Sequence, residues 1–250
     1  MCFKRIIDGC FDLLFPQRCQ VCDVALPETE RGAMVSKFCF DCCAGFELVV
    51  KPFCRVCGAE LYGDKEKGPL CGRCLKSSPP FAICRSLFRY GGEIQSLVHS
   101  LKYKKDSSVL TGIAELTGGI ELSEFSACDL IVPVPLHIKR LRQRGFNQAA
   151  LLALTIFGEG KKQVVPDLLC RTRNTVPQTS LDGLSRRKSL KGAFTVKRGD
   201  NIKGGVICLV DDVYTTGTTV AECSKTLILH GAASVKVLTL ARAELSPRAK

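Results

Sequence analysis

Apolar residues along the chain form either short continuous runs or stripes with helical spacing. The run at 206–210 has five apolar residues, three of them β-branched, which predicts a buried strand of a parallel sheet. Shorter runs predict further strands at 86–90, 130–135 and 234–240. Helical stripes lie between these runs, at 94–101, 145–154 and 220–227. Strands that alternate with helices predict an α/β fold, with a parallel sheet flanked by helices.

A further helix is predicted at the N-terminus. Residues 2–15 carry apolar side chains at helical spacing, and this helix ends before Pro16. We expect it to pack on its own protein, with a partner groove or a membrane surface as alternatives. Asp8 and Asp12 interrupt the apolar segment, which argues against a signal peptide, and no apolar run approaches the roughly eighteen residues of a membrane span. We therefore expect a reducing cytoplasm, where cysteines seldom form disulfides.

Eight of the 16 cysteines form four Cys-x-x-Cys pairs. The pairs are Cys19/Cys22, Cys39/Cys42, Cys54/Cys57 and Cys71/Cys74. Sixteen residues separate the first two pairs and thirteen the last two, which is close to the spacing of zinc ribbons with four cysteine ligands. Gly58 and Gly72 stand where a metal-binding knuckle favours a positive φ. The spacing therefore predicts two zinc ions.

Both zinc ions are predicted to be structural. Four thiolates leave no position on the metal for a water molecule, and a ribbon of this size has few large apolar side chains to bury. The simplest arrangement assigns consecutive pairs to one zinc each. A crossed arrangement, the first pair with the third and the second with the fourth, is left open by the spacing, and Cys43 is an alternative ligand. Redox chemistry and rubredoxin-like iron are further alternatives.

Composition divides the chain at 77–80, because Ser-Ser-Pro-Pro is typical of a linker. The predicted parts are an N-terminal helix at 1–18, a double zinc ribbon at 19–76, the linker at 77–80 and the α/β domain at 81–250.

The formal net charge of +12 is not spread evenly between these parts. Residues 1–76 hold 11 Lys and Arg against 10 Asp and Glu, and the remainder holds 25 against 14. Two zinc ions on eight thiolates would make the ribbon weakly negative, so it is not expected to attract DNA by charge alone. The basic surplus lies in the α/β domain, where anionic phosphates account for part of it and single-stranded DNA is a further candidate partner.

Candidate binding residues follow the strand at 206–210. Asp211 and Asp212 come first, and Thr215, Thr216, Gly217, Thr218 and Thr219 then lead into a helix that begins near Val220. A loop between a strand's carboxyl end and a helix's amino end favours a phosphate, because backbone N–H groups and the helix dipole point at it. The carboxylates would repel a bare phosphate but accept hydrogen bonds from sugar hydroxyls. Together they predict a ribose 5-phosphate site.

This stretch allows two other interpretations. An ordinary strand end with an N-capping threonine explains the loop but not the pair of carboxylates. A Walker-B-like strand of an NTPase needs a Gly-x-x-x-x-Gly-Lys-Ser/Thr loop, and the chain has none, since residues 158–162 lack the spacing and the hydroxyl.

Basic residues follow a second strand. Four of them come after the strand at 130–135: Lys139, Arg140, Arg142 and Arg144. At this position they suit the binding of a pyrophosphate. The alternative is that they form the basic, solvated face of a helix. The polar, basic segment at 171–189 has the length of a functional lid, which would bring its arginines to a leaving group and exclude water.

The stretch from 209 to 219 resembles the PRPP-binding motif of type I phosphoribosyltransferases, PRPP being phosphoribosyl pyrophosphate. The whole chain resembles the ComF family of bacterial proteins, in which a double zinc ribbon precedes a phosphoribosyltransferase-like domain. The motifs that carry the resemblance are the four Cys-x-x-Cys pairs, 132–136, 144–148, Gln178 with Arg187 and 192–194, and Asp211-Asp212 with the threonine loop. Ser189 departs from the family pattern, which usually has Asn there.

The resemblance implies a cytoplasmic role in DNA uptake during natural transformation, often beside a helicase-like partner. Our first hypothesis is a Mg²⁺-dependent phosphoribosyltransferase. Asp211 and Asp212 hold the ribose hydroxyls, residues 215–219 bind the 5-phosphate, and Arg144 stabilises the departing pyrophosphate. The second is a non-catalytic adaptor that binds PRPP or nucleic acid, with zinc ribbons that dock a DNA-uptake partner. The sequence identifies no acceptor base, so it leaves the choice open.

Overall fold

The structure is a computed structural model, and it describes residues 16–26, 37–61, 69–104, 106–158, 162–173, 190–197 and 202–243. The chain forms two compact units, one of Met1–Glu47 with Gly91–Ile120 and one of Leu48–Tyr90 with Glu121–Lys250. The helix predicted at 2–15 and residues 174–189 of the predicted lid lie outside the described residues. The predicted domain boundary at 77–80 stays a prediction.

The first unit is helical in its described part. Its helices are α2 (Phe40–Ala44), α4 (Gly92–His99), the π-helix η3 (Ser100–Lys104) and α5 (Val109–Gly118). The stripe predicted at 94–101 is confirmed, because Ile94, Leu97 and Val98 on α4 and Leu101 on η3 are all buried. Within the described residues, no helix is both long and apolar enough to cross a membrane.

The second unit is built on a parallel five-stranded sheet, as predicted. Its strands are β1 (Ile83–Arg89), β2 (Leu130–Pro133), β3 (Gln163–Val164), β6 (Val206–Tyr214) and β7 (Ser234–Arg242). Their order is β1-β7-β6-β2-β3, and every neighbouring pair is parallel. Its helices are α3 (Gly72–Lys76), η4 (Ser123–Phe125), α6 (Ile138–Arg144), α7 (Gln148–Phe157) and α9 (Thr218–Leu229). A separate antiparallel pair joins β4 (Leu169–Arg171) to β5 (Phe194–Val196).

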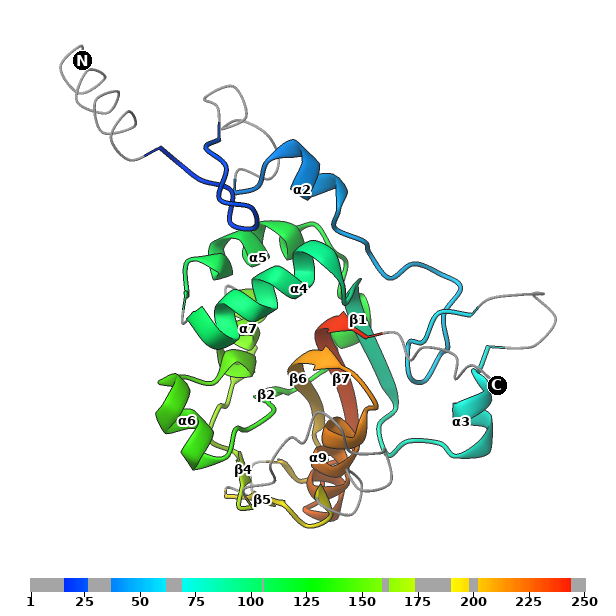
Figure 1. Ribbon diagram of the computed structural model, residues 1–250. Coiled ribbons are helices and arrows are strands. Elements are labelled where there is room, and N and C mark those ends of the chain that lie inside the picture. Colours follow the sequence, from blue (N-terminus) through cyan, green and yellow to red (C-terminus); the bar gives the residue numbers. More distant parts are fainter. Residues whose placement is uncertain are drawn as a thin grey trace, which may run out of the picture. The chain divides into compact units, whose positions relative to one another are not determined.

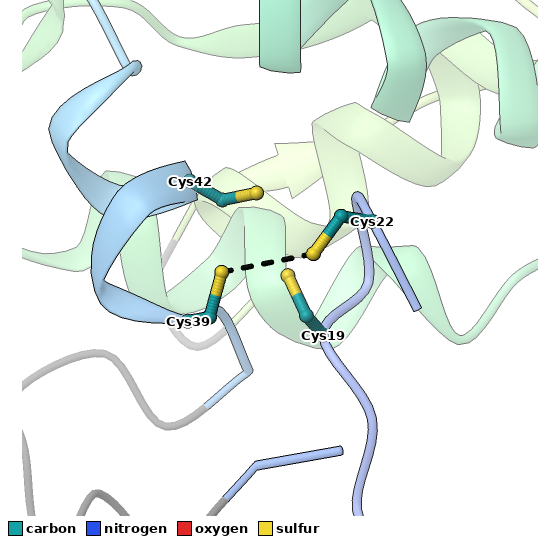
Figure 2. A group of neighbouring side chains, drawn as sticks. All are labelled: Cys19, Cys22, Cys39 and Cys42. Carbon is teal, nitrogen blue, oxygen red and sulfur yellow. Dashed lines mark hydrogen bonds between the residues drawn. The ribbon is translucent and has the colours of Figure 1, made fainter. Parts of the chain in front are cut away.

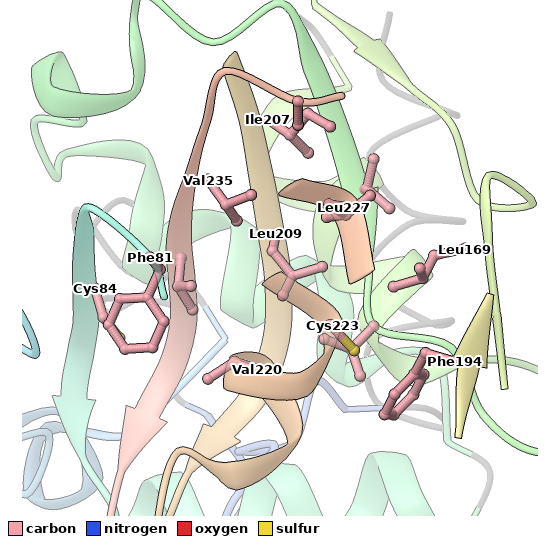
Figure 3. Close-up of a cluster of buried hydrophobic side chains, with 14 of the residues drawn as sticks. Phe81, Cys84, Leu169, Phe194, Ile207, Leu209, Val220, Cys223, Leu227 and Val235 are labelled. Carbon is pink, nitrogen blue, oxygen red and sulfur yellow. The ribbon is translucent and has the colours of Figure 1, made fainter. Parts of the chain in front are cut away.

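The core of this unit forms where α9 packs on the central strands (Figure 1). Ile207 and Leu209 are two positions apart on β6, so their side chains point to the same face of the sheet. They belong to one buried cluster with residues of α9, namely Val220, Cys223 and Leu227 (Figure 3). Full burial of each large aliphatic side chain contributes about 1.5–3 kcal/mol. This packing fixes the amino end of α9 next to the carboxyl end of β6.

The strand order also marks where a ligand is expected. The chain passes from β2 through α6 and α7 to β3, and from β6 through α9 to β7. Since β2 and β6 are neighbours, the two connections leave in opposite directions. In open α/β sheets, ligands bind outside the carboxyl ends of the strands at such a switch point.

Two predicted boundaries were wrong near this point. The strand predicted to end at Val210 continues to Tyr214, because β7 runs beside it and pairs through Arg242. The helix predicted to begin near Val220 begins at Thr218. Asp211 and Asp212 therefore lie inside β6, and only residues 215–217 form the loop.

Candidate functional site: a phosphate loop and two cysteine clusters

The structure brings consecutive Cys-x-x-Cys pairs together, and the crossed arrangement is wrong. The sulfurs of Cys19, Cys22, Cys39 and Cys42 lie within 4.8 Å of one another, as do those of Cys54, Cys57, Cys71 and Cys74. Cys43 is not among them. Figure 2 shows the four side chains of the first cluster converging on one point.

The sulfur spacing fits zinc. Tetrahedral zinc with Zn–S bonds of about 2.3 Å separates its sulfurs by about 3.8 Å. The sulfurs of Cys22 and Cys39 are 3.7 Å apart, and those of Cys57 and Cys71 are 3.6 Å apart. Both clusters are therefore consistent with structural zinc sites in which every ligand is a thiolate.

The protein environment already favours the thiolate form at one position of each cluster. Burial raises the pKa of Cys19 and of Cys54, but nearby backbone N–H donors outweigh it and lower both pKa values to about 7. At Cys42 and Cys74, burial and hydrogen bonds with other cysteines of the cluster raise the pKa. Because a thiolate is the ligand that zinc binds, metal binding must release the protons that remain.

Local backbone geometry shapes the second knuckle, which consists of the two Cys-x-x-Cys turns of the second cluster, 54–57 and 71–74. Gly58 has the predicted positive φ, 70°, and a Cβ atom there would lie 2.5 Å from the carbonyl oxygen of Cys84. The same prediction for Gly72 was wrong, because Gly72 is the first residue of α3 and is helical. Cys71 occupies the N-cap of that helix, so the helix itself presents the ligand.

Asp211 and Asp212 are held by the strand that contains them. Pairing between β6 and β2 ends at Val210 in the described residues, and the Asp212 N–H instead donates to Asp211 Oδ1 at 2.9 Å. The Val213 N–H donates to Asp212 Oδ1 at 2.9 Å. Asp212 is only 6% exposed, whereas Asp211 is half-buried. These backbone bonds orient both carboxylates at the end of the sheet.

The loop at 215–217 is tightly constrained. Gly217 is the N-cap of α9 and has a φ of 75°, and a Cβ atom there would overlap the hydroxyl group of the buried Tyr214. The hydroxyls of Thr216 and Thr218 are 2.9 Å apart. The first N–H groups of any α-helix lack an intrahelical partner, so this turn presents N–H and hydroxyl donors side by side. Such a turn suits a phosphate.

Arg171 interacts electrostatically with Arg140 and with Asp211. Arg171, which the sequence placed in the lid, belongs to β4 and makes an isolated bridge with His137 after β2. Burial lowers the pKa of Arg171, Arg140 lowers it further, and Asp211 acts in the opposite direction. Arg171 is thus within electrostatic reach of both Arg140 and Asp211.

Arg144 was predicted to face the pyrophosphate. It ends α6, is half-buried, and donates from Nη1 to Gln148 Oε1 at 2.8 Å. Gly145 follows it with a φ of 89°, which ends the helix in the left-handed conformation. The contact fixes the guanidinium group against α7, and its role toward a ligand stays a prediction.

A cavity of about 700 Å³ adjoins the threonine loop. Thr216, Gly217 and Thr218 line it together with cationic side chains of α3 and α9, among them Arg73 and Lys225. Arg73 comes from the second knuckle and was not predicted to take part. No local pattern could have revealed it, because 143 residues separate it from its partner Thr216.

The chain is similar to several known proteins. Residues 10–75 match the family model described as a double zinc ribbon domain. The chain is 33% identical over 210 residues to the DNA utilization protein YhgH of Escherichia coli O157:H7, covering 76% of this chain and 89% of that protein. It is 30% identical over 209 residues to competence protein F of Haemophilus influenzae, covering 80% and 90%. A solved hypoxanthine-guanine-xanthine phosphoribosyltransferase aligns with 56% of this chain and 66% of its own, at 21% identity and a TM-score of 0.32.

Proposed function

The chain belongs to the ComF/YhgH family of competence and DNA utilization proteins, and we propose that it binds PRPP with Mg²⁺ as part of DNA uptake. The proposal rests on this membership and on the geometry of the site. The observation that carries the proposal is the placement of two oriented carboxylates and a donor-rich turn at the two ends of one short segment. Asp211 and Asp212 lie in the last half of β6, and the turn at Gly217 follows within a few residues.

The two ends suit opposite parts of a phosphorylated ribose. Carboxylate oxygens only accept hydrogen bonds, so Asp211 and Asp212 would hold the 2- and 3-hydroxyls. The threonine hydroxyls and the N–H groups at the amino end of α9 would hold the 5-phosphate. A carboxylate directly beside a phosphate repels it, and the intervening loop residues keep the two apart. This division assigns the neutral hydroxyls to the strand and the charged phosphate to the turn.

The pyrophosphate of PRPP needs positive charge at the same end of the sheet. Arg140 lies in α6, which follows β2, and Arg171 of β4 bridges to His137 just before that helix. Asp211 raises the pKa of Arg171 and so favours its charged form, against the burial that lowers it. We assign these two arginines, with Arg144, to the pyrophosphate. Mg²⁺, when bound with PRPP, would supply further charge neutralisation on its oxygens. The chain itself would orient the sugar and hold the leaving group.

A second candidate function is a binding module without turnover. The names of the relatives describe DNA utilization and competence rather than phosphoribosyl transfer. This observation favours an adaptor that uses PRPP or a nucleic-acid phosphate as a ligand. Single-stranded DNA and a helicase-like competence protein are the partners that such an adaptor would join. The two candidates share one binding site and differ only in whether pyrophosphate leaves.

Calorimetry with PRPP and Mg²⁺ on zinc-loaded protein tests the shared site. The change Asp212→Asn should weaken PRPP binding about 10- to 100-fold, because it replaces a charge-assisted hydrogen bond by a neutral one. Glu121→Gln is the matched control, since it makes the same chemical change at an exposed position. Absence of heat with the wild-type protein would refute the site.

Turnover is tested separately, by pyrophosphate release from PRPP across a panel of bases. Release that is lost in Asp212→Asn supports the transferase, and tight binding without release supports the adaptor. For the adaptor, the affinity for single-stranded DNA should fall steeply with salt, because each neutralised phosphate releases counterions. An affinity that does not change with salt would exclude contact with several phosphates.

A further inference from the structure

We propose that the second cysteine cluster positions the threonine loop, with Arg73 as the positioning residue that transmits the placement. The consequence for ligand affinity rests on the proposed function, but the placement of the loop does not. The inference concerns only the second unit, which contains both the cluster and the loop.

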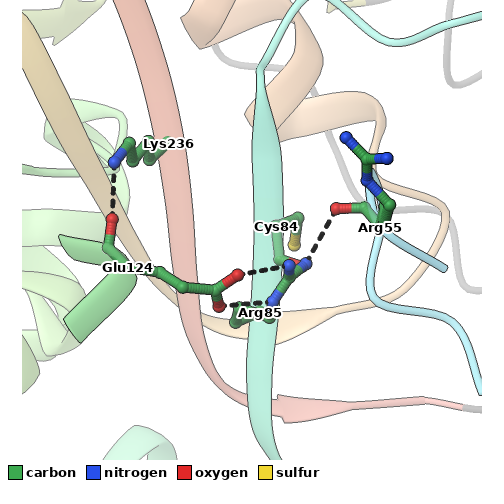
Figure 4. A network of polar contacts seen from close by, with 5 residues as sticks. All are labelled: Arg55, Cys84, Arg85, Glu124 and Lys236. Carbon is green, nitrogen blue, oxygen red and sulfur yellow. Dashed lines mark hydrogen bonds and ion pairs between the residues drawn. The ribbon is translucent and has the colours of Figure 1, made fainter. Parts of the chain in front are cut away.

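The second knuckle is anchored to the edge strand of the sheet. The Cys84 N–H of β1 donates to the Val56 carbonyl oxygen at 2.6 Å. Arg85, also on β1, donates from Nη1 to the Arg55 carbonyl oxygen at 3.0 Å (Figure 4). It also donates two hydrogen bonds of 2.6 Å to the Glu124 carboxylate, from Nε and Nη2. These bonds hold the backbone between Cys54 and Cys57 in a defined place.

A second arginine connects the same knuckle to β7. Arg242, at the end of β7, is 9% exposed and donates from Nη1 to the Cys57 carbonyl oxygen at 2.7 Å. Its guanidinium group also lies 4.4 Å from the centre of the Tyr214 ring. Tyr214 is the residue that lies against Gly217, so one side chain touches both the knuckle and the base of the loop.

Arg73 completes the connection. It lies in α3, directly before the ligand Cys74, and donates from Nη2 to the Thr216 carbonyl oxygen at 3.1 Å. That carbonyl belongs to the middle of the three-residue loop. A cation fixed on this oxygen restrains the peptide plane that leads into Gly217 and the amino end of α9.

The position of Arg73 depends on the metal. The helix α3 has five residues, which is too short to be stable by itself in water. Cys71 stands at the N-cap position and Cys74 lies inside the helix, so two of the four ligands hold this one turn. When the metal is removed, α3 loses the contacts that order it, and Arg73 leaves Thr216. The zinc ion thereby acts on the loop without touching any ligand bound there.

Backbone hydrogen exchange tests the placement directly, on the full-length zinc-loaded protein. Arg73→Gln should speed exchange of the segment 215–220 about threefold to tenfold, because it removes a charged donor from the loop carbonyl. Arg55→Gln is the matched control: it lies in the same knuckle, loses the same charge, and offers only its backbone to Arg85. Arg73→Lys keeps one charged donor and should restore most of the protection, at an unchanged unfolding midpoint.

Metal depletion and ligand binding provide two further readouts. Chelation that removes zinc from wild-type protein should speed exchange of 215–220 at least as much as Arg73→Gln does. PRPP binding should weaken about threefold to tenfold in Arg73→Gln and remain unchanged in Arg55→Gln.

Equal exchange in Arg73→Gln and Arg55→Gln would overturn the positioning role, and undiminished protection after zinc removal would overturn its dependence on the metal. If Arg73→Gln fails to fold, the Arg73→Lys variant and the metal-depleted protein decide the question. If the wild-type protein binds no PRPP, the proposed function fails, while the exchange data still decide whether the cluster positions the loop.

Discussion

Replacement of Gly217 by alanine tests the geometry of the phosphate loop most sharply. At a φ of 75°, an L-residue in the left-handed region costs about 1–2 kcal/mol. The added Cβ atom would also overlap the Tyr214 hydroxyl and lie 2.5 Å from its Cζ, and Tyr214 is buried, so it cannot move away freely. Overpacking of this kind costs about 1–3 kcal/mol. We expect Gly217→Ala to lower the free energy of unfolding by about 2–5 kcal/mol.

Gly204 provides a control with the same backbone strain and free space. Its φ is 73°, and a Cβ atom there would meet no heavy atom within 4 Å. Gly204→Ala should therefore cost only about 1–2 kcal/mol. Both glycines belong to the second unit, so urea unfolding followed by circular dichroism reports them in the same transition. Equal costs for the two variants would show that Tyr214 does not press on the loop, and the account of the loop geometry would fail.

Three further predictions concern metal, ionisation and the Arg85 network. Elemental analysis should find two zinc ions per chain, and one or none would contradict the two clusters. Burial raises the pKa of Cys84 from 9.0 to about 12, so the folded protein keeps a proton that the unfolded chain releases. The free energy of unfolding should be unaffected by this group below pH 9.0 and fall by about 1.4 kcal/mol per pH unit above it, until pH about 12. Cys84→Ala should remove that slope in urea titrations at several pH values, and an unchanged slope would exclude Cys84 as its source. Arg85→Ala should lower the free energy of unfolding by about 2–3 kcal/mol. Glu124→Gln should lower it by about 1 kcal/mol or less, because the Glu124 side chain is 45% exposed. If urea unfolding ranks the two variants the other way, Arg85 is not the more important partner of this pair.

Most elements of the sheet could be predicted because the apolar pattern reports burial locally. The run at 206–210 and the stripe of α4 lie where they were expected. The end of β6 could not be predicted, since two aspartates interrupt the apolar run and pairing there depends on the length of β7. That length is set by residues some thirty positions further along the chain, so the signal is not local.

The residues of the candidate site were likewise predictable only where the sequence signal is local. The eight cysteines, the two aspartates and the threonine loop were predicted because each motif is contiguous or has a regular spacing. Arg73 and Arg242 were missed because their partners are 143 and 185 residues away. Arg171 was noticed as a basic residue but assigned to the lid, and only the register between β4 and β5 shows that it belongs to a strand.

These contacts imply that the two ends of the proposed ligand are held by different means. Asp211 and Asp212 sit within a strand that pairs with β7 through Asp211 and again at Val213 and Tyr214, so the sugar end is ordered by the sheet itself. The phosphate end is a three-residue loop with a strained glycine, and such a loop needs outside support to stay in one conformation. Arg73 and Tyr214 supply that support from the second knuckle and from the end of β6. The zinc ribbon is therefore more than a separate module beside the proposed phosphate site, because Arg73 in its second half contacts the loop that forms this site.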